Sequence, residues 1–196
     1  NKKLEELEFQ YKKSQEIYQE ESQKLSNLRK KSSQELDNLI NKELPDLKLE
    51  NARFQTFFEM DAPTENGFDK VTFKIKTNPN SEMGSIKDVS SGGELCRIAL
   101  AIKVIAQKSS KTTMVFDEVD SGIGGAVSTA VGERLNKLGI TKQVIVVTHS
   151  PQVAAFGNDH FIVYKTINNN ESIINLKLLD KDQKINEIAR MLSGKE

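Results

Sequence analysis

Residues Ser90 to Ile98 read Ser-Ser-Gly-Gly-Glu-Leu-Cys-Arg-Ile, and residues Met114 to Glu118, further along the chain, read Met-Val-Phe-Asp-Glu. The first stretch sets serine and two glycines directly before an apolar run. That order is typical of a helix start that offers free backbone N–H groups to a phosphate. The second stretch is an apolar strand ending in two adjacent carboxylates, which suits Mg²⁺ binding and the activation of water. Together the two stretches predict part of an ATP site in an α/β fold.

The loop that would grip the phosphates of the nucleotide does not occur in the sequence. No Gly-x-x-x-x-Gly-Lys-Ser/Thr motif is found in the 196 residues. We therefore expect this loop to lie on another polypeptide segment. Because the chain also opens without an initiator methionine, in a stretch of helical pattern, we expect it to be a fragment of a longer protein.

Composition limits the class of protein. A hydrophobic content of 37% and a charged content of 29% predict one globular domain with a solvated appendage. Lysine plus arginine equals aspartate plus glutamate at 28 each, so charge alone does not indicate a nucleic-acid partner. A single cysteine, Cys96, excludes an intramolecular disulfide, and the sequence shows neither a membrane-spanning run nor a signal peptide. These features favour the cytoplasm.

Residues 1 to 44 contain no glycine or proline and carry an interrupted heptad pattern. Starting from Leu4, the apolar seam positions are Leu4, Leu7, Tyr11, Tyr18, Leu25, Leu28 and Leu39. A single helix with such a seam, roughly 65 Å long at 1.5 Å per residue, needs a partner to cover it. We therefore expect 1–44 to be one strand of an antiparallel coiled-coil arm and 45–196 to be a globular lobe. The alternative is a lone amphipathic helix folded onto the globular domain.

The rest of the sequence predicts alternating strands and helices. Strands are expected at 53–58, 71–77, 112–116, 143–147, 160–164 and 173–179, and helices at 91–108 and 126–138, after Ser150, and after Asp180. The strand at 112–116, the helix at 126–138 and the strand at 143–147 have the lengths of a βαβ crossover, which predicts a parallel sheet. Both of these strands are continuous apolar runs, as in sheets covered on two faces.

The candidate chemistry gathers where these two strands end. In open parallel sheets, ligands bind beyond the carboxyl ends of the strands. Asp117 at the end of the first strand is expected to hold Mg²⁺ through water, and Glu118 to accept a proton from the attacking water. His149, just beyond the second strand, is placed to hydrogen-bond the γ-phosphate of ATP. The competing interpretations are a solvated strand end for the carboxylates and a structural role for the histidine.

The helix start after residue 90 allows the same two interpretations. Ser91 has capping-box spacing to Glu94, so it is explained equally well as an ordinary helix cap. Gly92 and Gly93 would then only make the backbone flexible before the helix, without binding a ligand. Two consecutive glycines are nevertheless poor helix formers, at about 1 kcal/mol each relative to alanine, and they are justified if a phosphate must approach the backbone closely.

These motifs together resemble the ATP-binding-cassette heads of the SMC-like family, and most closely its bacterial DNA-repair members. Ser90 to Glu94 looks like the signature motif, Met114 to Glu118 like Walker B with its glutamate, Ser121 to Gly124 falls at the D-loop, and His149 at the switch histidine. The resemblance is carried further by Phe116 to Ile123, Thr148 to Ala154 and Glu187 to Leu192. The chain departs from the pattern at Ser90, where most signatures have leucine, and at Cys96, where serine is usual.

The resemblance implies that this chain is the C-terminal lobe of such a head, with ATP and Mg²⁺ as cofactors. Two heads would sandwich two nucleotides. Each nucleotide would be held by the P-loop, Asp117 and Glu118 of one head, and capped by the signature and D-loop residues of the other, which here are Ser91, Gly92, Gly93, Glu94, Ser121 and Gly122.

The resemblance also implies the partners. These are an N-terminal half carrying the P-loop, a second head in a homodimer, an antiparallel coiled-coil strand, and DNA during double-strand-break repair at the nucleoid. The fragment alone is expected to be inactive. Two alternatives stay open at this point: a non-catalytic scaffold that bridges protein or DNA, and the head of another SMC-like protein.

Overall fold

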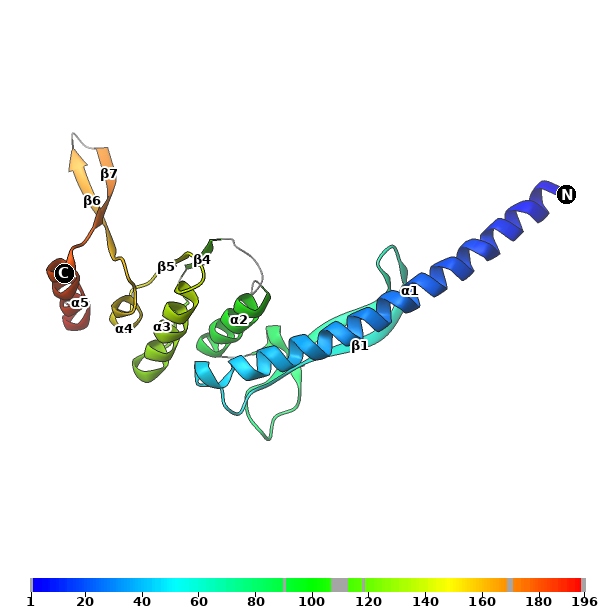
Figure 1. The fold of residues 1–196 in the computed structure, drawn as a ribbon, viewed down its shortest axis with the longest axis horizontal. Coiled ribbons are helices and arrows are strands. Elements are labelled where there is room, and N and C mark those ends of the chain that lie inside the picture. The colour runs from blue at the N-terminus through cyan, green and yellow to red at the C-terminus, as the bar shows by residue number, and fades with distance from the viewer. Residues whose placement is uncertain (1, 90, 107–112, 118, 169–170, 195–196) are drawn as a thin grey trace. The chain divides into compact units, whose positions relative to one another are not determined.

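The structure, a computed structural model, describes residues 2–89, 91–106, 113–117, 119–168 and 171–194. The chain divides into two compact units, Asn1–Glu43 with Asn51–Val89, and Leu44–Glu50 with Ser90–Glu196 (Figure 1). In chain order the elements are α1 (Lys2–Glu43), η1 (Pro45–Leu47), β1 (Arg53–Thr64), β2 (Gly67–Lys76), β3 (Gly84–Ser85), η2 (Ile86–Asp88), α2 (Gly92–Ala106), β4 (Met114–Asp117), α3 (Gly125–Gly139), β5 (Val144–Val147), α4 (Pro151–Ala155), β6 (Phe161–Asn168), β7 (Glu171–Leu178) and α5 (Lys181–Ser193).

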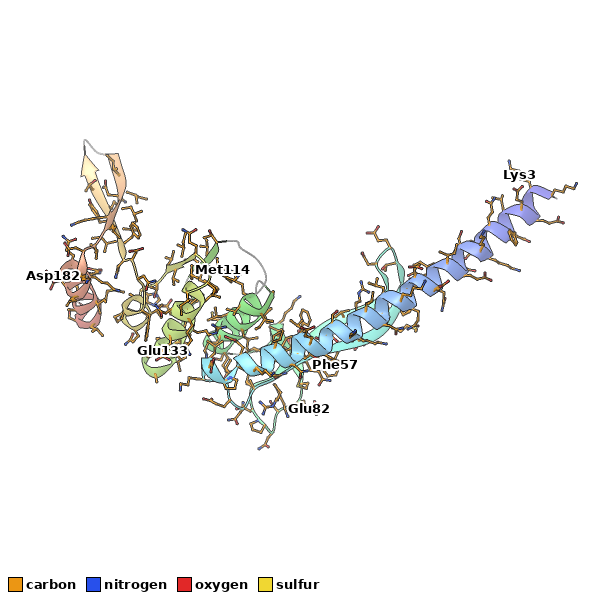
Figure 2. All side chains as sticks on the ribbon, viewed as in Figure 1. Lys3, Phe57, Glu82, Met114, Glu133 and Asp182 are labelled. Carbon is orange, nitrogen blue, oxygen red and sulfur yellow. The ribbon has the colours of Figure 1, made fainter. Side chains whose placement is uncertain are left out.

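The first unit is a long helix with an antiparallel ribbon along its second half. The helix predicted over 1–44 is confirmed as α1, and the predicted ribbon as β1 paired with β2. The loop between the two strands is Glu65–Asn66, followed by Gly67 at φ 87°, a left-handed conformation that favours glycine. Before the ribbon begins, side chains project on all sides of α1 near Lys3 (Figure 2). The apolar side chains Leu4, Leu7, Phe9, Tyr11 and Ile17 are exposed there.

Side chains of α1 occupy the free edge of β1. Asn41 donates to the carbonyl of Phe54 at 2.8 Å and accepts from its N–H at 2.9 Å. Asp37 accepts from the N–H of Thr56 at 3.0 Å and from its hydroxyl at 2.7 Å. These contacts satisfy backbone groups that an edge strand otherwise leaves unpaired. The helix therefore takes the place of a further strand at this edge.

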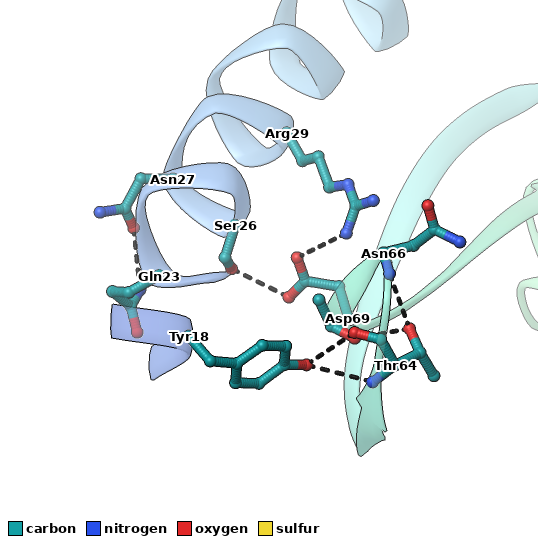
Figure 3. Close-up of polar contacts among 9 residues, drawn as sticks. Tyr18, Gln23, Ser26, Asn27, Arg29, Thr64, Asn66 and Asp69 are labelled. Carbon is teal, nitrogen blue, oxygen red and sulfur yellow. Dashed lines mark hydrogen bonds and ion pairs between the residues drawn. The ribbon is translucent and has the colours of Figure 1, made fainter. Parts of the chain in front are cut away.

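The same pattern continues toward the tip of the ribbon (Figure 3). The Tyr18 hydroxyl donates to the carbonyl of Thr64 at 3.0 Å and accepts from its N–H at 3.1 Å. Asp69 of β2 accepts from the Ser26 hydroxyl at 2.9 Å and pairs with Arg29 at 3.3 Å. Because the Asp69 side chain is only 6% exposed, this contact is shielded from solvent. Polar contacts thus hold the ribbon to the helix along its length.

The second unit contains the predicted parallel βαβ arrangement. β4 pairs with β5 in parallel, with Asp117 opposite Val147, and α3 forms the crossover. Among the described residues, the two faces of this sheet differ in cover. Phe116 is 2% exposed and receives the Lys103 ammonium of α2 over its ring at 4.7 Å, whereas Val115 is 52% exposed. Ile145 and Val147 are exposed in the same way, so one apolar face of β4 and β5 is not covered by the described residues.

The chain ends in a second ribbon and a capped helix. β6 pairs with β7 in antiparallel orientation, and one face of this ribbon is apolar and exposed along Phe161, Val163, Ile174, Leu176 and Leu178. The predicted cap of the last helix is confirmed, since Asp180 and Gln183 form a reciprocal capping box. Gly194 adopts the left-handed conformation at the other end of α5.

The ribbon at 53–76 shares a compact unit with α1, whereas the sequence analysis grouped it with the lobe. The division into an arm strand over 1–44 and a lobe over 45–196 stays a prediction about the roles of the two parts. None of the helices within the described ranges combines the length and apolarity that crossing a bilayer requires.

Candidate functional site

The candidate site lies at the carboxyl edge of the parallel pair β4 and β5. Asp117 is the last residue of β4 and stands opposite Val147, the last residue of β5, so His149 leaves the sheet at the same edge as the carboxylate. The predicted proximity of these two strand ends is therefore confirmed. Asp117 and His149 are both exposed. Glu118, the predicted base, lies outside the described residues.

The residues present fit a Mg²⁺ ion that is shared with a nucleotide. Within the described ranges, no group of three or more His, Cys, Asp and Glu side chains could hold a metal by itself. Mg²⁺ in nucleotide sites usually takes one or two carboxylates and completes its shell with phosphate oxygens and water. An exposed Asp117 at a strand end supplies the protein share of such a shell. Its predicted role as a ligand through water stays a prediction.

The helix start predicted at Ser91 is confirmed. The Ser91 hydroxyl accepts from the N–H of Glu94 at 3.4 Å, and the Ser91 carbonyl accepts from the N–H of Leu95 at 3.0 Å. Gly92 is exposed at the first position of α2, whereas Gly93 is buried at the second. The cap accounts for Ser91 by itself. The phosphate-binding roles of Ser91, Gly92, Gly93 and Glu94 stay predictions.

Gly93 contacts the turn that follows β4. A Cβ atom at Gly93 would lie 2.6 Å from Ile123 Cγ2 and 3.0 Å from the carbonyl oxygen of Gly122, whereas one at Gly92 would meet no described residue within 4 Å. Gly122 has φ 71° and, like Ser121, is exposed. Close approach of two backbones thus explains one of the two glycines. The structure brings the predicted signature and D-loop segments into direct contact.

This difference between the two glycines gives a matched pair of variants. Gly93→Ala is expected to lower the thermal unfolding midpoint of the chain by several degrees, because the added methyl group forces α2 and the 120–124 turn apart, at about 1–3 kcal/mol. Gly92→Ala has free space and is expected to leave the midpoint unchanged or to raise it slightly. Circular dichroism melting curves measure both. Equal midpoints for the two variants would contradict the contact.

Sequence reasoning missed the residue that joins the two strand ends. Asp120, 1% exposed, lies in the turn after β4. Its Oδ2 accepts from the N–H of Ser150 at 3.0 Å and from the hydroxyl of Thr148. Both partners are neighbours of His149. The only sequence signal was an extra acidic residue shortly after the carboxylate pair. A solvated side chain in a turn would explain that residue equally well.

Sequence reasoning also missed the role of Arg97. From the sequence, this side chain could pair with Glu94 or reach across to a partner head, yet it is 8% exposed. It donates to the carbonyls of Gly93 at 3.1 Å, Leu47 at 2.8 Å and Lys48 at 2.9 Å. Burial lowers the pKa of Arg97, and the negative charges of Glu94 and Glu50 oppose that shift. The guanidinium thus fastens the start of α2 to the segment around η1.

Comparison with known proteins identifies the family. The chain is 41% identical over 157 residues to the DNA repair protein RecN of Rickettsia conorii, which covers 80% of the chain and 29% of that relative. It is 42% identical over 161 residues to RecN of Vibrio cholerae, a match that covers 81% of the chain and 29% of that relative. It is 36% identical over 193 residues to RecN of Bacillus subtilis, a match that covers 90% of the chain and 34% of that relative. The chain belongs to the RecN family. It spans about a third of the length of these relatives, and no protein-family model matches it.

Solved structures show the same fold. The chain matches an SMC structure from work on ATP-driven dimerisation and DNA-stimulated activation of SMC ATPases, with TM-score 0.60 and 17% identity over 85% of this chain and 96% of that one. It also matches the Smc head domain with a coiled coil and joint from Pyrococcus yayanosii, with TM-score 0.67 and 17% identity over 96% of this chain and 35% of that one. The α/β fold of an SMC-like head, predicted from the sequence, is confirmed.

Proposed function

We propose that this chain is the C-terminal portion of an SMC-like, ATP-hydrolysing head that acts in the repair of DNA double-strand breaks. The observation that carries the proposal is the parallel register of β4 and β5, which sets Asp117 and His149 at one edge of the sheet. A strand-end carboxylate beside an exposed histidine is the arrangement that a nucleotide γ-phosphate and its Mg²⁺ require. The RecN relatives, named as DNA repair proteins, support the biological role.

Each residue of this edge has a distinct proposed role. Mg²⁺, when bound with ATP, neutralises charge on the phosphates. Asp117 would hold the ion through water, and Glu118 would accept the proton of the attacking water. His149 donates a hydrogen bond to the γ-phosphate from its exposed position after β5. The competing role of His149 as a structural residue is disfavoured, because a structural histidine would be buried or packed.

The P-loop lies on a part of the protein that precedes this chain in the proposed head. Two observations support this proposal. The 196 residues contain no P-loop motif, and the chain spans 29% of the Rickettsia and Vibrio relatives. The uncovered apolar face of β4 and β5, at Val115, Ile145 and Val147, supplies the surface on which that N-terminal part packs. Burial of such a face is the driving force for association.

The proposed pocket is completed by a second head. The signature residues Ser91, Gly92, Gly93 and Glu94, with Ser121 and Gly122, would face the nucleotide bound to the partner head in a homodimer. The contact of Gly93 with Gly122 supports a single surface that contains both segments. The exposed apolar side chains of α1 support pairing with an antiparallel coiled-coil strand. Head engagement would then act on DNA through this arm, at the nucleoid.

ATP turnover by the complete protein tests the proposal. We expect Mg²⁺-dependent hydrolysis that Glu118→Gln lowers by at least about 100-fold while ATP binding persists, because only the proton acceptor is lost. We expect the 196-residue chain alone to show no turnover above the level of its own Glu118→Gln variant.

Two results would contradict the proposal. Turnover by the chain alone that Glu118→Gln removes would mean that no P-loop from another segment is needed. If the complete protein carrying Glu118→Gln turned over ATP at the unchanged rate, a non-catalytic scaffold would be favoured.

A further inference from the structure

Asp120 forms a small closed network with both neighbours of His149. Its Oδ2 accepts from the N–H of Ser150 at 3.0 Å and from the hydroxyl of Thr148. The Thr148 hydroxyl oxygen in turn accepts from the same Ser150 N–H at 2.9 Å. Because one carboxylate oxygen binds on either side of His149, the backbone that carries the histidine is fixed at both ends.

The hydrogen bonds of this network are buried or partly buried, which distinguishes them from ordinary solvent-exposed polar contacts. Asp120 is 1% exposed and Ser150 is 8% exposed, whereas His149 between the two bonded positions is exposed. The other oxygen of Asp120, Oδ1, is also buried and has no hydrogen-bond partner among the described residues. A buried carboxylate with one unsatisfied oxygen is unfavourable for folding. An aspartate at this position therefore points to a role beyond stability.

The turn that contains Asp120 also reaches the start of α2. The N–H of Ile123 donates to the carbonyl of Asp120 at 3.3 Å, which folds the turn back on itself. Ile123 and Gly122 are the residues that Gly93 contacts. One turn therefore contacts the loop of His149 through the Asp120 side chain, and the helix start through the Ile123 side chain and the Gly122 backbone.

We propose that Asp120 is a positioning residue that sets the orientation of His149 and couples it to the helix start at Gly93. This inference rests on the proposed function, because it assigns to Asp120 the control of the histidine in that site. When the nucleotide engages the helix start, a shift there reaches His149 through the 120–123 turn and the Asp120 carboxylate. Asp120 itself contacts neither nucleotide nor water in this role.

A double-mutant cycle in the complete protein tests the proposal. We expect Asp120→Ala and His149→Ala each to lower kcat for ATP by roughly 10- to 100-fold, as displacement of a catalytic group by about 1 Å does. The KM for ATP should change by less than about threefold. The double variant should be no slower than His149→Ala alone, because Asp120 acts through the histidine. If the fold-losses in kcat of the two single variants multiplied in the double variant, the proposal would be overturned.

Variants of Thr148 separate positioning from folding. Thr148→Ser keeps the hydroxyl that donates to Asp120 and should retain most of kcat. Thr148→Val keeps the shape of the side chain without the hydroxyl, and its kcat should fall about as far as that of Asp120→Ala. Ser128→Ala removes another buried hydroxyl, which has no partner among the described residues, and should leave kcat unchanged. Equal loss in Thr148→Ser and Thr148→Val would contradict the network.

NMR spectra of the histidine rings test the positioning role of Asp120 separately from the proposed ATPase function. The chain has two histidines, so the ring resonances of His149 can be assigned with a His149→Gln variant. We expect Asp120→Asn to shift and broaden the His149 ring signals and to leave those of His160 in place. If His149→Ala left ATP turnover intact, the role of the histidine in hydrolysis would be wrong, and the spectra would still decide the positioning. Unchanged His149 signals would overturn it.

Discussion

Asp117→Asn in the complete protein is expected to lower ATP turnover by at least about 100-fold. The substitution keeps the shape of the side chain and removes the negative charge that would anchor the Mg²⁺ shell. Asp117 is exposed at the end of β4, so the change should leave the fold intact. Steady-state ATPase assays across a Mg²⁺ titration measure the effect, and excess Mg²⁺ should restore part of the lost rate.

A matched control comes from η1. Asp46 is also exposed, and Asp46→Asn removes the same charge from a residue that does not belong to the parallel strands. It should leave both turnover and its Mg²⁺ dependence unchanged. An Asp117→Asn protein with normal turnover would show that the strand-end carboxylate is an ordinary solvated group.

Arg97→Ala is expected to destabilise the chain by about 3 kcal/mol, because three backbone carbonyls lose their donor and two of these lie in the segment around η1. Lys48, one of the acceptors, adopts a left-handed backbone with φ 57°, which is unfavourable for a residue with a Cβ. Without the guanidinium this turn loses two of its hydrogen bonds, those to the carbonyls of Leu47 and Lys48. The thermal unfolding midpoint should fall by roughly 6–12 °C.

Arg190→Ala is the control for this arginine. Arg190 binds Glu187 through two hydrogen bonds of 2.9 and 2.7 Å, but its side chain is 50% exposed. Exposed ion pairs contribute about 0–1 kcal/mol, so the midpoint should move by at most about 4 °C. If the two variants melted alike, burial would not be what makes Arg97 important.

Local patterns in the sequence predicted most of the elements. The absence of glycine and proline up to Leu44 predicted α1, and the alternation of Val71, Phe73 and Ile75 predicted β2. Cap residues predicted helix starts well, because a cap is a contact between residues three apart. Ser91 and Asp180 both accept the expected N–H. The parallel register, and hence the meeting of Asp117 with the His149 segment, followed from the length of the crossover.

Contacts between distant segments were not predictable in this way. Asp120 binds Thr148 and Ser150 across about thirty positions, and Arg97 binds Leu47 and Lys48 across about fifty. Their sequence neighbours suggest only a turn aspartate and an arginine that pairs with Glu94 or with a partner head. Whether such a side chain is buried depends on tertiary packing, which has no local period.

The segment that covers the exposed face of the sheet is also not given by local patterns. The apolar runs at Val115 and Val147 predict cover on both faces, and among the described residues these two side chains are exposed. Periodicity reports what a strand must bury and not which segment covers it. An apolar strand pattern with one exposed face is what a chain spanning about a third of its relatives can show.

Mixing two inactive variants of the complete protein tests the shared pocket most directly. Ser91→Arg blocks the capping surface of a head, and Glu118→Gln removes the proton acceptor, so each variant alone should be inactive. In an equal mixture, half of the dimers pair one subunit of each kind and contain one intact pocket out of two, which predicts about one quarter of the wild-type ATPase rate. The Ser91→Arg/Glu118→Gln double variant mixed with Glu118→Gln should recover nothing. A mixture of the two single variants that stays inactive would contradict a pocket built from two heads.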